Sequence, residues 1–285
     1  PNASARAVNS MVKKIAYLGP PGTYSEQAAE QWNNVDELLP LESIPAVAKS
    51  VEDGESFQGV LPIENSIEGG VTFTLDLLIH DSLLSICGEV IVPINHYLMA
   101  HEEIDLSSVT TVYSHPQSLG QCRQFLLNNL PQADLVASLS NAKAVEEMLS
   151  ANRGAAAISS ERSANLYGAT VLKKNVEDNP NNETRFVVLS NNDHEMTSDD
   201  KTSLCFEFDG DSPGILSESL TEFASRNINL VKIESRPNKR RLGRYVFLVD
   251  IDGHRKTLEV KEALDALASK VSMLKIFGSY PKCEI

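Results

Sequence analysis

Three features are scarce in this sequence: long apolar runs, paired cysteines and positive charge. No apolar run approaches the roughly 20 residues that a membrane-spanning helix requires. Lys and Arg number 25 against 39 Asp and Glu, which gives a formal net charge of -14. Nucleic acid and anionic membranes bind to a basic face, so we expect neither as a partner. A small anionic substrate remains compatible, provided that positive charge is concentrated locally.

The cysteine pattern excludes further kinds of site. Cys87, Cys122, Cys205 and Cys283 stand far apart, with no C-x-x-C pair and no cluster of histidines beside them. Zinc sites and dithiol redox sites use such pairs or clusters. We therefore expect buried, reduced thiols in a cytoplasmic protein. Nothing in the sequence indicates a metal or an organic cofactor.

Length and composition suggest two domains. The 285 residues, of which 42% are hydrophobic and 22% charged, are typical of a soluble globular protein with room for one large and one small domain, or for two medium ones. Residues 1–12 carry no apolar segment and are expected to be a disordered remnant outside the fold. Residues 191–200 are polar, acidic and without apolar periodicity, so they predict a linker. These boundaries predict domains over 13–190 and 201–285.

The first domain alternates short apolar runs with amphipathic stretches. Residues 15–18 predict a strand, which leads through a Gly-Pro-Pro-Gly turn into a helix with a capping box formed by Thr23 and Glu26. Strand, polar turn and helix follow each other again after residues 59–63, 109–113 and 155–158. Strands that repeatedly run into helices indicate an α/β domain with a mostly parallel sheet.

After residue 200 the pattern changes. Residues 204–208 alternate apolar and polar side chains, and Ser212 and Pro213 then predict the N-cap and first turn of a helix. Strands are predicted at 228–233 and 245–251, a helix with one apolar face at 260–271, and a last strand at 276–280. The order βαββαβ over about 80 residues predicts a ferredoxin-like domain.

Small polar residues lie at the strand-to-helix turns of the first domain. Helix N-termini present unpaired N–H groups, and ligands of open α/β sheets collect at the carboxyl ends of the strands. Such residues are therefore candidates for binding a carboxylate or phosphate, although each could instead simply cap its helix. They are Thr23, Ser25, Asn65, Ser66, Gln117, Ser118, Ser159 and Ser160.

Thr184 and Arg185 form a sharper candidate pair. A threonine hydroxyl can donate to a departing oxygen, and an arginine fork matches a carboxylate; an exposed strand would explain the same two residues. Glu64 is the best placed carboxylate for acid–base chemistry, but complementing a helix N-terminus explains it equally well. His115 could be a general acid or a turn residue bonded to the backbone.

The second domain contains two polar segments and one basic turn. The segments 212–216 and 234–237 need not face one pocket within a single ferredoxin-like unit, but they can do so across a side-by-side dimer. The basic turn is interpreted as a solvated hairpin. Its residues are Lys239, Arg240, Arg241 and Arg244.

Taken in order, six stretches resemble the prephenate dehydratases that carry a C-terminal ACT regulatory domain. They are AYLGPPGTYS at 16–25, LPIENSIEG at 61–69, SHPQSLGQC at 114–122, NETRF at 182–186, SPGIL at 212–216 and IESRP at 233–237. Two departures are Ile215, where the family usually has alanine, and Asn141, where it usually has threonine. The resemblance implies a two-lobed catalytic domain like a periplasmic binding protein, with lobe crossings near Val92 and Thr170.

The resemblance also implies a reaction and its regulation. Prephenate would lose water and carbon dioxide to give phenylpyruvate in L-phenylalanine biosynthesis, and L-phenylalanine would inhibit through the ACT domain of a dimer or tetramer. Thr184 would assist departure of the hydroxyl, and Arg185 would clamp the pyruvyl carboxylate or act by orientation. The implied catalytic residues are Thr184, Arg185, Glu64, Asn65 and Ser66. The implied substrate-binding residues are Thr23, Ser25, His115, Gln117, Ser118, Gln121, Ser140, Asn141 and Phe186.

The effector site is implied in the same way. Its residues are Asp211, Pro213, Gly214, Ile215, Leu216, Ser217, Asn229, Leu230, Glu234, Ser235, Arg236 and Pro237. Two rival interpretations remain: dehydration of arogenate, which no residue here distinguishes, and a non-catalytic sensor of amino acids with the same two lobes. The presence of Thr184 and Arg185 together with Glu64, Asn65 and Ser66 argues against the sensor, whereas the fold alone would not.

Overall fold

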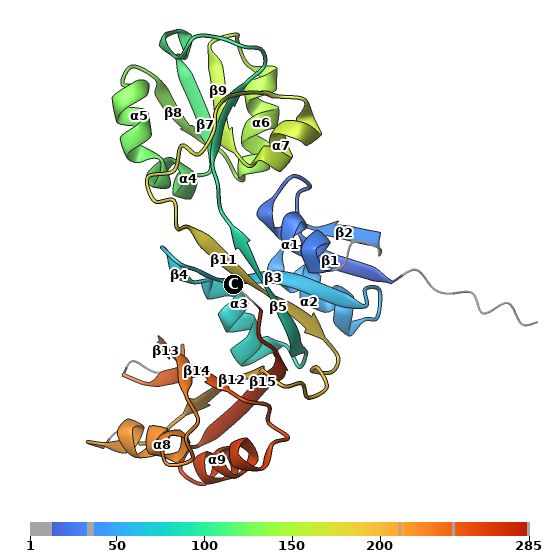
Figure 1. The fold of residues 1–285 in the computed structure, drawn as a ribbon, viewed down its shortest axis with the longest axis vertical. Coiled ribbons are helices and arrows are strands. Elements are labelled where there is room, and N and C mark those ends of the chain that lie inside the picture. Colours follow the sequence, from blue (N-terminus) through green and yellow to red (C-terminus); the bar gives the residue numbers. More distant parts are fainter. Residues whose placement is uncertain (1–12, 33–36, 211, 241–242, 284–285) are drawn as a thin grey trace, which may run out of the picture.

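The molecule consists of three bodies stacked along its long axis (Figure 1). The computed structural model describes residues 13–32, 37–210, 212–240 and 243–283; the expected remnant at 1–12 lies outside this part. A first lobe occupies the middle, a second lobe lies on one side of it, and the C-terminal domain lies on the other. Among the described residues, no helix is long and apolar enough to cross a membrane.

The first lobe is built on a sheet with the strand order β2-β1-β3-β11-β5, in which β4 also pairs with β3. Its helices are short, and α3 continues directly into a π-helical turn, η1. The elements are β1 (Lys14–Leu18), α1 (Tyr24–Trp32), β2 (Glu37–Leu41), α2 (Ile44–Glu52), β3 (Gln58–Asn65), β4 (Gly69–Gly70), α3 (Thr72–Asp76), η1 (Leu77–Asp81), β5 (Ser85–Pro93) and β11 (Glu183–Ser190).

The second lobe is built on a five-stranded sheet with the order β10-β6-β9-β7-β8. Helices α4 and α6 begin within four residues of the ends of strands β7 and β8 and point their N-termini towards the first lobe (Figure 1). The elements are β6 (Tyr97–Ala100), η2 (Leu106–Ser108), β7 (Thr111–Ser114), α4 (Pro116–Gln121), α5 (Arg123–Asn129), β8 (Asp134–Ala137), α6 (Asn141–Ser150), β9 (Ala155–Ser159), α7 (Glu161–Tyr167) and β10 (Thr170–Lys173).

Both sheets are mixed, so the expectation of a mostly parallel sheet is wrong. Strand β11 runs antiparallel to β3 and to β5, while β1 pairs in parallel with β2 and β3. The reason is the path of the chain: it leaves the first lobe after β5, returns through β11, and the outgoing and returning strands lie side by side. The connecting segments are 94–96 and 174–182, next to the expected crossings near Val92 and Thr170.

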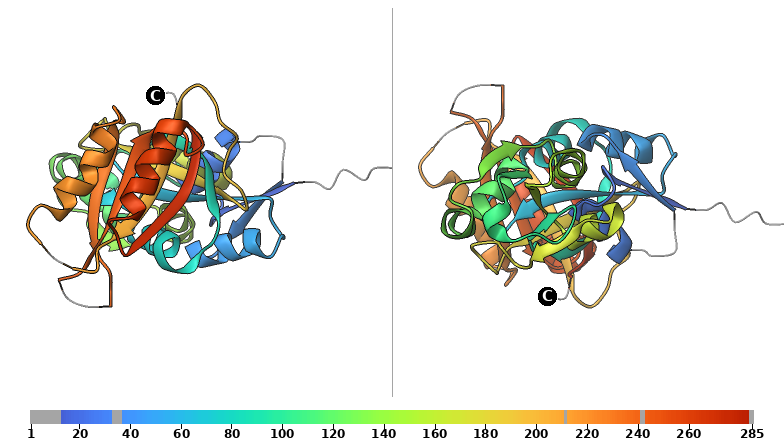
Figure 2. Two further views of the ribbon diagram at one scale, coloured as in Figure 1. Left: turned by 90° about the horizontal axis from the view of Figure 1, so that it is seen from below. Right: turned by 90° about the horizontal axis from the view of Figure 1, so that it is seen from above.

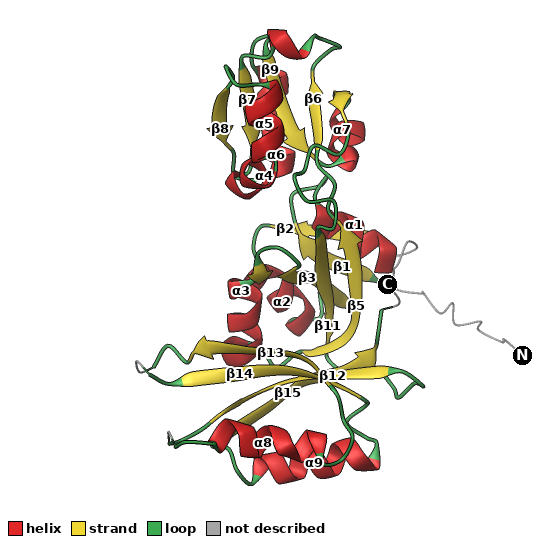
Figure 3. Cartoon of the chain, turned by 60° about the vertical axis from the view of Figure 1, so that its left-hand side comes forward, coloured by secondary structure: helices red, strands yellow, loops and turns green. Residues whose placement is uncertain are grey.

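The C-terminal domain has the predicted βαββαβ order. Its strands form an antiparallel sheet in the order β13-β14-β12-β15, and both helices cover one face (Figure 3). Seen along the long axis, α8 and α9 lie across these strands (Figure 2). The elements are β12 (Asp200–Glu207), α8 (Ile215–Ala224), β13 (Leu230–Pro237), β14 (Tyr245–Asp252), α9 (Leu258–Ala268) and β15 (Met273–Pro281).

Two details of this domain differ from the sequence prediction. Helix α8 begins at Ile215 with Gly214 as its N-cap, rather than at Ser212 and Pro213. Gly214 has a φ of 88°, a left-handed conformation that stops a helix from starting earlier and that glycine adopts without strain. Asp200, expected to end the linker, is already part of β12.

The helix-free face of the C-terminal sheet packs against the first lobe. Cys205, Leu248 and Phe277 share one buried apolar cluster with Leu61 and Leu78 of the first lobe. At Gly278 the two backbones come so close that an added Cβ would lie 2.2 Å from the Ile86 carbonyl oxygen. The C-terminal domain and the first lobe therefore share a continuous core.

Candidate functional site

A cavity of about 600 Å³ lies where the two lobes meet. One wall comes from the turn between β1 and α1, and the other from the N-termini of α4 and α6. Six of the residues implied as substrate ligands line it. They are Thr23, Ser25, His115, Gln117, Ser140 and Asn141.

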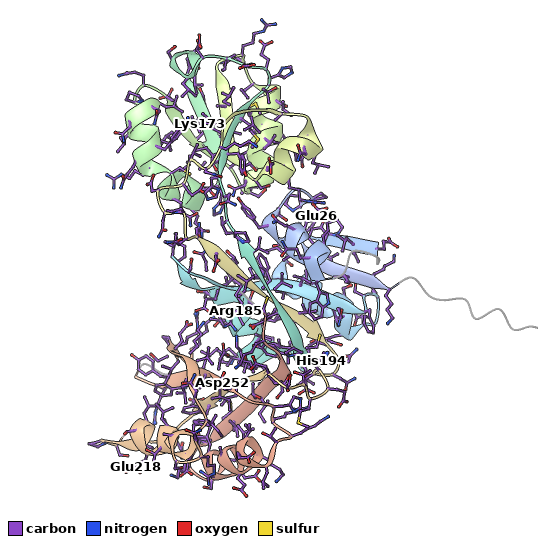
Figure 4. The ribbon with its side chains drawn as sticks, in the orientation of Figure 1. Glu26, Lys173, Arg185, His194, Glu218 and Asp252 are labelled. Carbon is purple, nitrogen blue, oxygen red and sulfur yellow. The ribbon has the colours of Figure 1, made fainter. Side chains whose placement is uncertain are left out.

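Short polar contacts hold the first-lobe wall. Thr23 Oγ1 accepts a hydrogen bond from the Glu26 backbone N–H at 3.4 Å, which is half of the predicted capping box. The Glu26 carboxylate instead accepts from the Gly22 N–H at 2.7 Å and from Arg162 of the second lobe at 2.6 Å. Burial raises the pKa of Glu26, but these donors outweigh it and the pKa lies below its usual value. Glu26 therefore joins the lobes through this ion pair, and Figure 4 shows it at the end of the first lobe that faces the second.

Asn141 and His115 shape the second-lobe wall. Asn141 Oδ1 accepts from the Ser114 hydroxyl at 3.1 Å and from the His115 backbone N–H at 3.2 Å, so its amide nitrogen is left for other partners. His115 Nδ1 accepts from the Gln117 N–H at 3.3 Å and caps α4. Burial lowers the pKa of His115. The histidine is thus a neutral turn residue, whose remaining nitrogen can act as a hydrogen-bond donor.

Thr184 is held by a second polar group, centred on Asn65. Asn65 Nδ2 donates to Thr184 Oγ1 at 3.0 Å and to Asn182 Oδ1 at 2.7 Å. Its Oδ1 accepts from the backbone N–H groups of Ile67 and Glu68, both at 3.0 Å, which fixes the orientation of the amide. Because Thr184 Oγ1 already accepts this bond, its own proton is available to a ligand.

This group reaches the second lobe through Gln121. Gln121 Oε1 accepts from Asn182 Nδ2 at 3.0 Å and lies 2.8 Å from His96 Nε2, while Gln121 Nε2 donates to Glu68 at 3.4 Å. Ser66 supports the same segment, since its hydroxyl donates to the Asn181 carbonyl and accepts from the Glu183 N–H. Thr184, Asn65, Ser66 and Gln121 are thus brought together, and none of the four is among the residues that line the cavity.

Arg185 points away from Thr184. Neighbouring residues of a strand face opposite sides of the sheet, and the guanidinium lies on the side that packs against the C-terminal domain. It pairs with Glu64 at 3.0 Å, Glu89 at 3.3 Å and Asp250 at 2.9 Å. Burial opposes its charge, but these carboxylates outweigh that and keep the pKa of Arg185 above its ordinary value. Glu64 also pairs with Lys232, so both residues belong to this domain contact.

Two further implied ligands are buried in the described structure. Phe186 is 2% exposed and packs in the first-lobe core with Tyr17 and Val90. Ser118 is 3% exposed within α4. The structure thus places both side chains inside their lobes and not on the cavity wall.

The implied effector residues fall into two separate groups. Gly214, Ile215, Leu216 and Ser217 line a pocket of about 510 Å³ together with residues of β14. Glu234 and Arg236 of β13 instead pair with Lys232 and Asp76 on the side of the first lobe. Ser235 and Pro237 follow on the same strand, Pro213 lies in the turn before α8, and Asp211 lies outside the described residues.

Asn229 and Leu230 lie between these two groups in the sequence. Asn229 Nδ2 donates to Asp252, and Leu230 packs against the core of the C-terminal domain. Within one chain, Glu234 and Arg236 therefore face away from the pocket beside α8, whereas Ser235 and Pro237 lie opposite Phe247 and Tyr245, which line it.

Several residues of the site were not singled out by the sequence. Glu89, Lys201 and Asp250 complete the ion-pair group around Arg185, and Asn182 and His96 extend the group around Thr184. A charged residue in the middle of an otherwise apolar strand, as at Glu89 and Asp250, was the available signal, because such a charge needs a buried partner.

Comparison with known proteins identifies the family. The prephenate dehydratase family model matches residues 15–194, more than half of the chain, and the ACT domain model matches residues 210–269. A prephenate dehydratase from Methanocaldococcus jannaschii is 38% identical over 278 residues, which cover 95% of this chain and 99% of that protein.

Two solved structures support the same fold along the whole chain. A prephenate dehydratase from Arthrobacter aurescens in complex with L-Phe has a TM-score of 0.87 and 36% identity, and the match covers 94% of this chain and 90% of that one. GqqA, described as a novel type of quorum quenching acylase, has a TM-score of 0.84 and 28% identity, with 95% and 98% covered. The chain belongs to the prephenate dehydratase family and carries a C-terminal ACT domain.

Proposed function

We propose that this enzyme converts prephenate to phenylpyruvate, with loss of water and carbon dioxide, in L-phenylalanine biosynthesis in the cytoplasm. The observation that carries the proposal is the Thr184 hydroxyl, which accepts from Asn65 at 3.0 Å and so keeps its own proton for a ligand. Hydrogen bonds through Asn65 and Asn182 link it to Gln121 of the second lobe, and the cavity lies at the same junction of the two lobes. Membership of the family supplies the reaction to which this arrangement is suited.

The reaction requires little from the protein beyond a fixed orientation of the substrate and one hydrogen-bond donor to the leaving oxygen. Expulsion of the ring hydroxyl and loss of the ring carboxylate produce an aromatic ring, which makes the product strongly favoured. Thr184 Oγ–H donates a hydrogen bond to the leaving oxygen, and the oriented amides of Asn65 and Asn182 support it. A threonine hydroxyl is a weak acid, so the assistance comes through the network rather than by complete proton transfer from Thr184.

The two substrate carboxylates need local positive charge in an acidic protein. The cavity supplies the N-terminus of α6, capped by Ser140, together with the side chains of Asn141 and Lys143. Arg185 is paired with three carboxylates of the protein. Its role is therefore to orient Thr184, because these pairs fix strand β11, on which both residues lie. This arrangement also avoids a tight clamp on the carboxylate that departs as carbon dioxide.

L-phenylalanine is the proposed feedback effector, bound in the pocket beside α8. The segment Glu234–Pro237 of a second protomer completes that site in a side-by-side dimer, because β13 is an edge strand whose Val231 and Ile233 are 47% and 46% exposed. Inhibition requires that L-phenylalanine bind two global states of the protein with different affinity.

The test is phenylpyruvate formation by the purified protein from prephenate, titrated with L-phenylalanine. If L-phenylalanine suppresses the turnover, both parts of the proposal are supported. If the turnover does not change with L-phenylalanine, L-phenylalanine is not the effector. Arogenate is assayed in parallel, because a preference for arogenate would replace the proposed substrate. If neither substrate is converted, the non-catalytic sensor and an acylase activity such as that named for GqqA become the functions to test.

A further inference from the structure

His96 is a buried histidine in the segment that connects the two lobes. Its side chain is 1% exposed, and its Nδ1 atom has no hydrogen-bond partner among the described residues. Its Nε2 atom lies 2.8 Å from Gln121 Oε1. The Tyr24 ring packs edge-on against the imidazole, with 6.3 Å between ring centres. An imidazole with one engaged and one unpartnered nitrogen in the interior requires an explanation.

The orientation of every amide between Thr184 and His96 follows from fixed groups. Backbone N–H groups occupy Asn65 Oδ1, so Asn65 Nδ2 donates to Asn182 Oδ1 at 2.7 Å, and its second proton is shared between Thr184 Oγ1 at 3.0 Å and the Glu183 carbonyl at 3.1 Å. Asn182 Nδ2 must then donate to Gln121 Oε1. At the other end Gln121 Nε2 faces the Glu68 carboxylate, which can only accept, and this gives Gln121 the same orientation.

The protonation of His96 follows from this chain. Since Gln121 Oε1 is an acceptor, His96 Nε2 must carry a proton and donate it. A second proton on Nδ1 would bury a charged N–H group without an acceptor, which is costly. His96 is therefore a neutral imidazole protonated on Nε2. Gln121 Oε1 receives two donors, one from each side, and cannot turn without losing both.

We propose that His96 is a positioning residue for the reaction: its Nε2–H bond locks Gln121, and Gln121 in turn holds Asn182, Asn65 and the Thr184 hydroxyl in their donating arrangement. This inference rests on the proposed function of Thr184. It assigns His96 no contact with substrate. Through Gln121, His96 fixes the position of the second lobe relative to strand β11.

The surroundings of His96 favour the neutral form at ordinary pH. Burial lowers the pKa of His96, while Gln121 and Glu177 act in the opposite direction more weakly. The titratable groups that face it are Glu177, whose carboxylate accepts from the His96 backbone N–H at 2.7 Å, and the Tyr24 phenol, whose pKa is raised by burial. Protonation of His96 at low pH would leave the Nε2–H bond to Gln121 in place, but it would bury a charge and an Nδ1–H group without an acceptor, which destabilises this junction of the lobes.

Two substitutions separate the hydrogen bond from simple packing. His96→Gln places an amide donor near the position of Nε2, whereas His96→Met fills similar space without a donor. Exposed His101→Met serves as a control. We expect His96→Met to lower kcat with prephenate by on the order of 10-fold to 100-fold, with KM changed much less. His96→Gln should recover most of the turnover that His96→Met loses. Its kcat should also lack the fall at low pH that protonation of His96 causes in the wild type.

A measurement that needs no substrate completes the test. In a long-range ¹H–¹⁵N spectrum of the wild-type chain, the His96 ring, identified by its absence from His96→Gln, should be the neutral Nε2–H form at pH 7. An Nδ1–H form or an imidazolium would overturn the inference, as would wild-type kcat in His96→Met or no recovery in His96→Gln. If prephenate is not a substrate, the proposed function fails in the assay, while the spectrum still reports on His96. If His96→Met does not fold, the spectrum and the pH profile of His96→Gln decide.

Discussion

Arg185 of strand β11 and Asp250 of strand β14 form an ion pair of 2.9 Å across the contact between the catalytic and ACT domains. Arg185 directly follows Thr184, so the strand that carries the hydroxyl of the proposed mechanism is tied to the ACT sheet by its next residue. Figure 4 shows Arg185 near the boundary between the two domains. Glu89 of the first lobe pairs with Arg185 and also with Lys201 of the ACT domain, so a second ion pair connects the same two domains.

This ion pair predicts a variant that loses regulation but keeps turnover. Asp250→Asn removes the charge and retains the oxygen that accepts from Ser203 at 2.6 Å. Arg185 keeps Glu64 and Glu89, so the loss of stability should be smaller than the about 3–5 kcal/mol of a fully broken buried pair. We expect unchanged kcat without effector and a several-fold higher L-phenylalanine concentration for half inhibition, as a coupling of about 1–3 kcal/mol allows.

The matched control is Asp265→Asn, which breaks an exposed pair with Lys261 on α9. It should alter neither the inhibition nor the melting temperature. Inhibition curves of Asp250→Asn and wild type that superimpose would show that the effector signal does not pass through this pair.

A second prediction concerns the hydroxyl of Thr184. Thr184→Ala removes the donor but leaves Asn65 bonded to Asn182, so the lobe junction should persist. We expect kcat to fall by about 100-fold or more while KM changes little, since the hydroxyl acts on the leaving group in the transition state. Thr184→Ser retains the hydroxyl and should retain a large part of the turnover. Steady-state kinetics with prephenate measure both, and equal kcat for Thr184→Ala and wild type would remove Thr184 from the mechanism.

Arg244 leads to a prediction about the effector pocket. It lines the pocket beside α8, and its Nη1 atom is buried without a hydrogen-bond partner among the described residues. A guanidinium so placed suits the carboxylate of an amino acid. Arg244→Met should weaken L-phenylalanine binding by about 10-fold or more, the size of a hydrogen bond to a charged group. Titration calorimetry measures this, with exposed Arg240→Met as control; equal affinities would exclude a role for Arg244.

Much of the fold could be predicted from the sequence because it follows local patterns. Apolar alternation, turn residues and helix faces are encoded by neighbouring residues, and they predicted the βαββαβ domain and the successive strands and helices of the first. The direction of β11 could not be predicted in this way. It depends on where the chain re-enters the first lobe, about 90 residues after leaving it, and no local pattern encodes that pairing.

The site shows the same limit. Thr23, Ser25, Gln117 and Ser160 were expected to gather because turns at the carboxyl ends of strands share an edge, and they line the cavity. Arg185 was grouped with Thr184 because the two are adjacent in sequence, yet strand alternation places adjacent side chains on opposite faces. Its partner Asp250 lies 65 positions away on the chain, in another domain, where sequence patterns give no register.

The buried neutral state of His96 predicts how stability depends on pH. The pKa of His96 is lowered in the folded protein, whereas an unfolded histidine titrates near about 6.5. Below that pH the unfolded chain binds a proton that the folded chain does not, so the free energy of unfolding falls as pH decreases from 7.5 towards the folded pKa, by at most about 1.4 kcal/mol per pH unit. Urea unfolding at pH 7.5 and 5.5 should show a smaller decrease for His96→Gln than for wild type. His101→Gln, at an exposed position, should behave as wild type; a decrease in His96→Gln as large as in wild type would mean that His96 is charged in the folded protein.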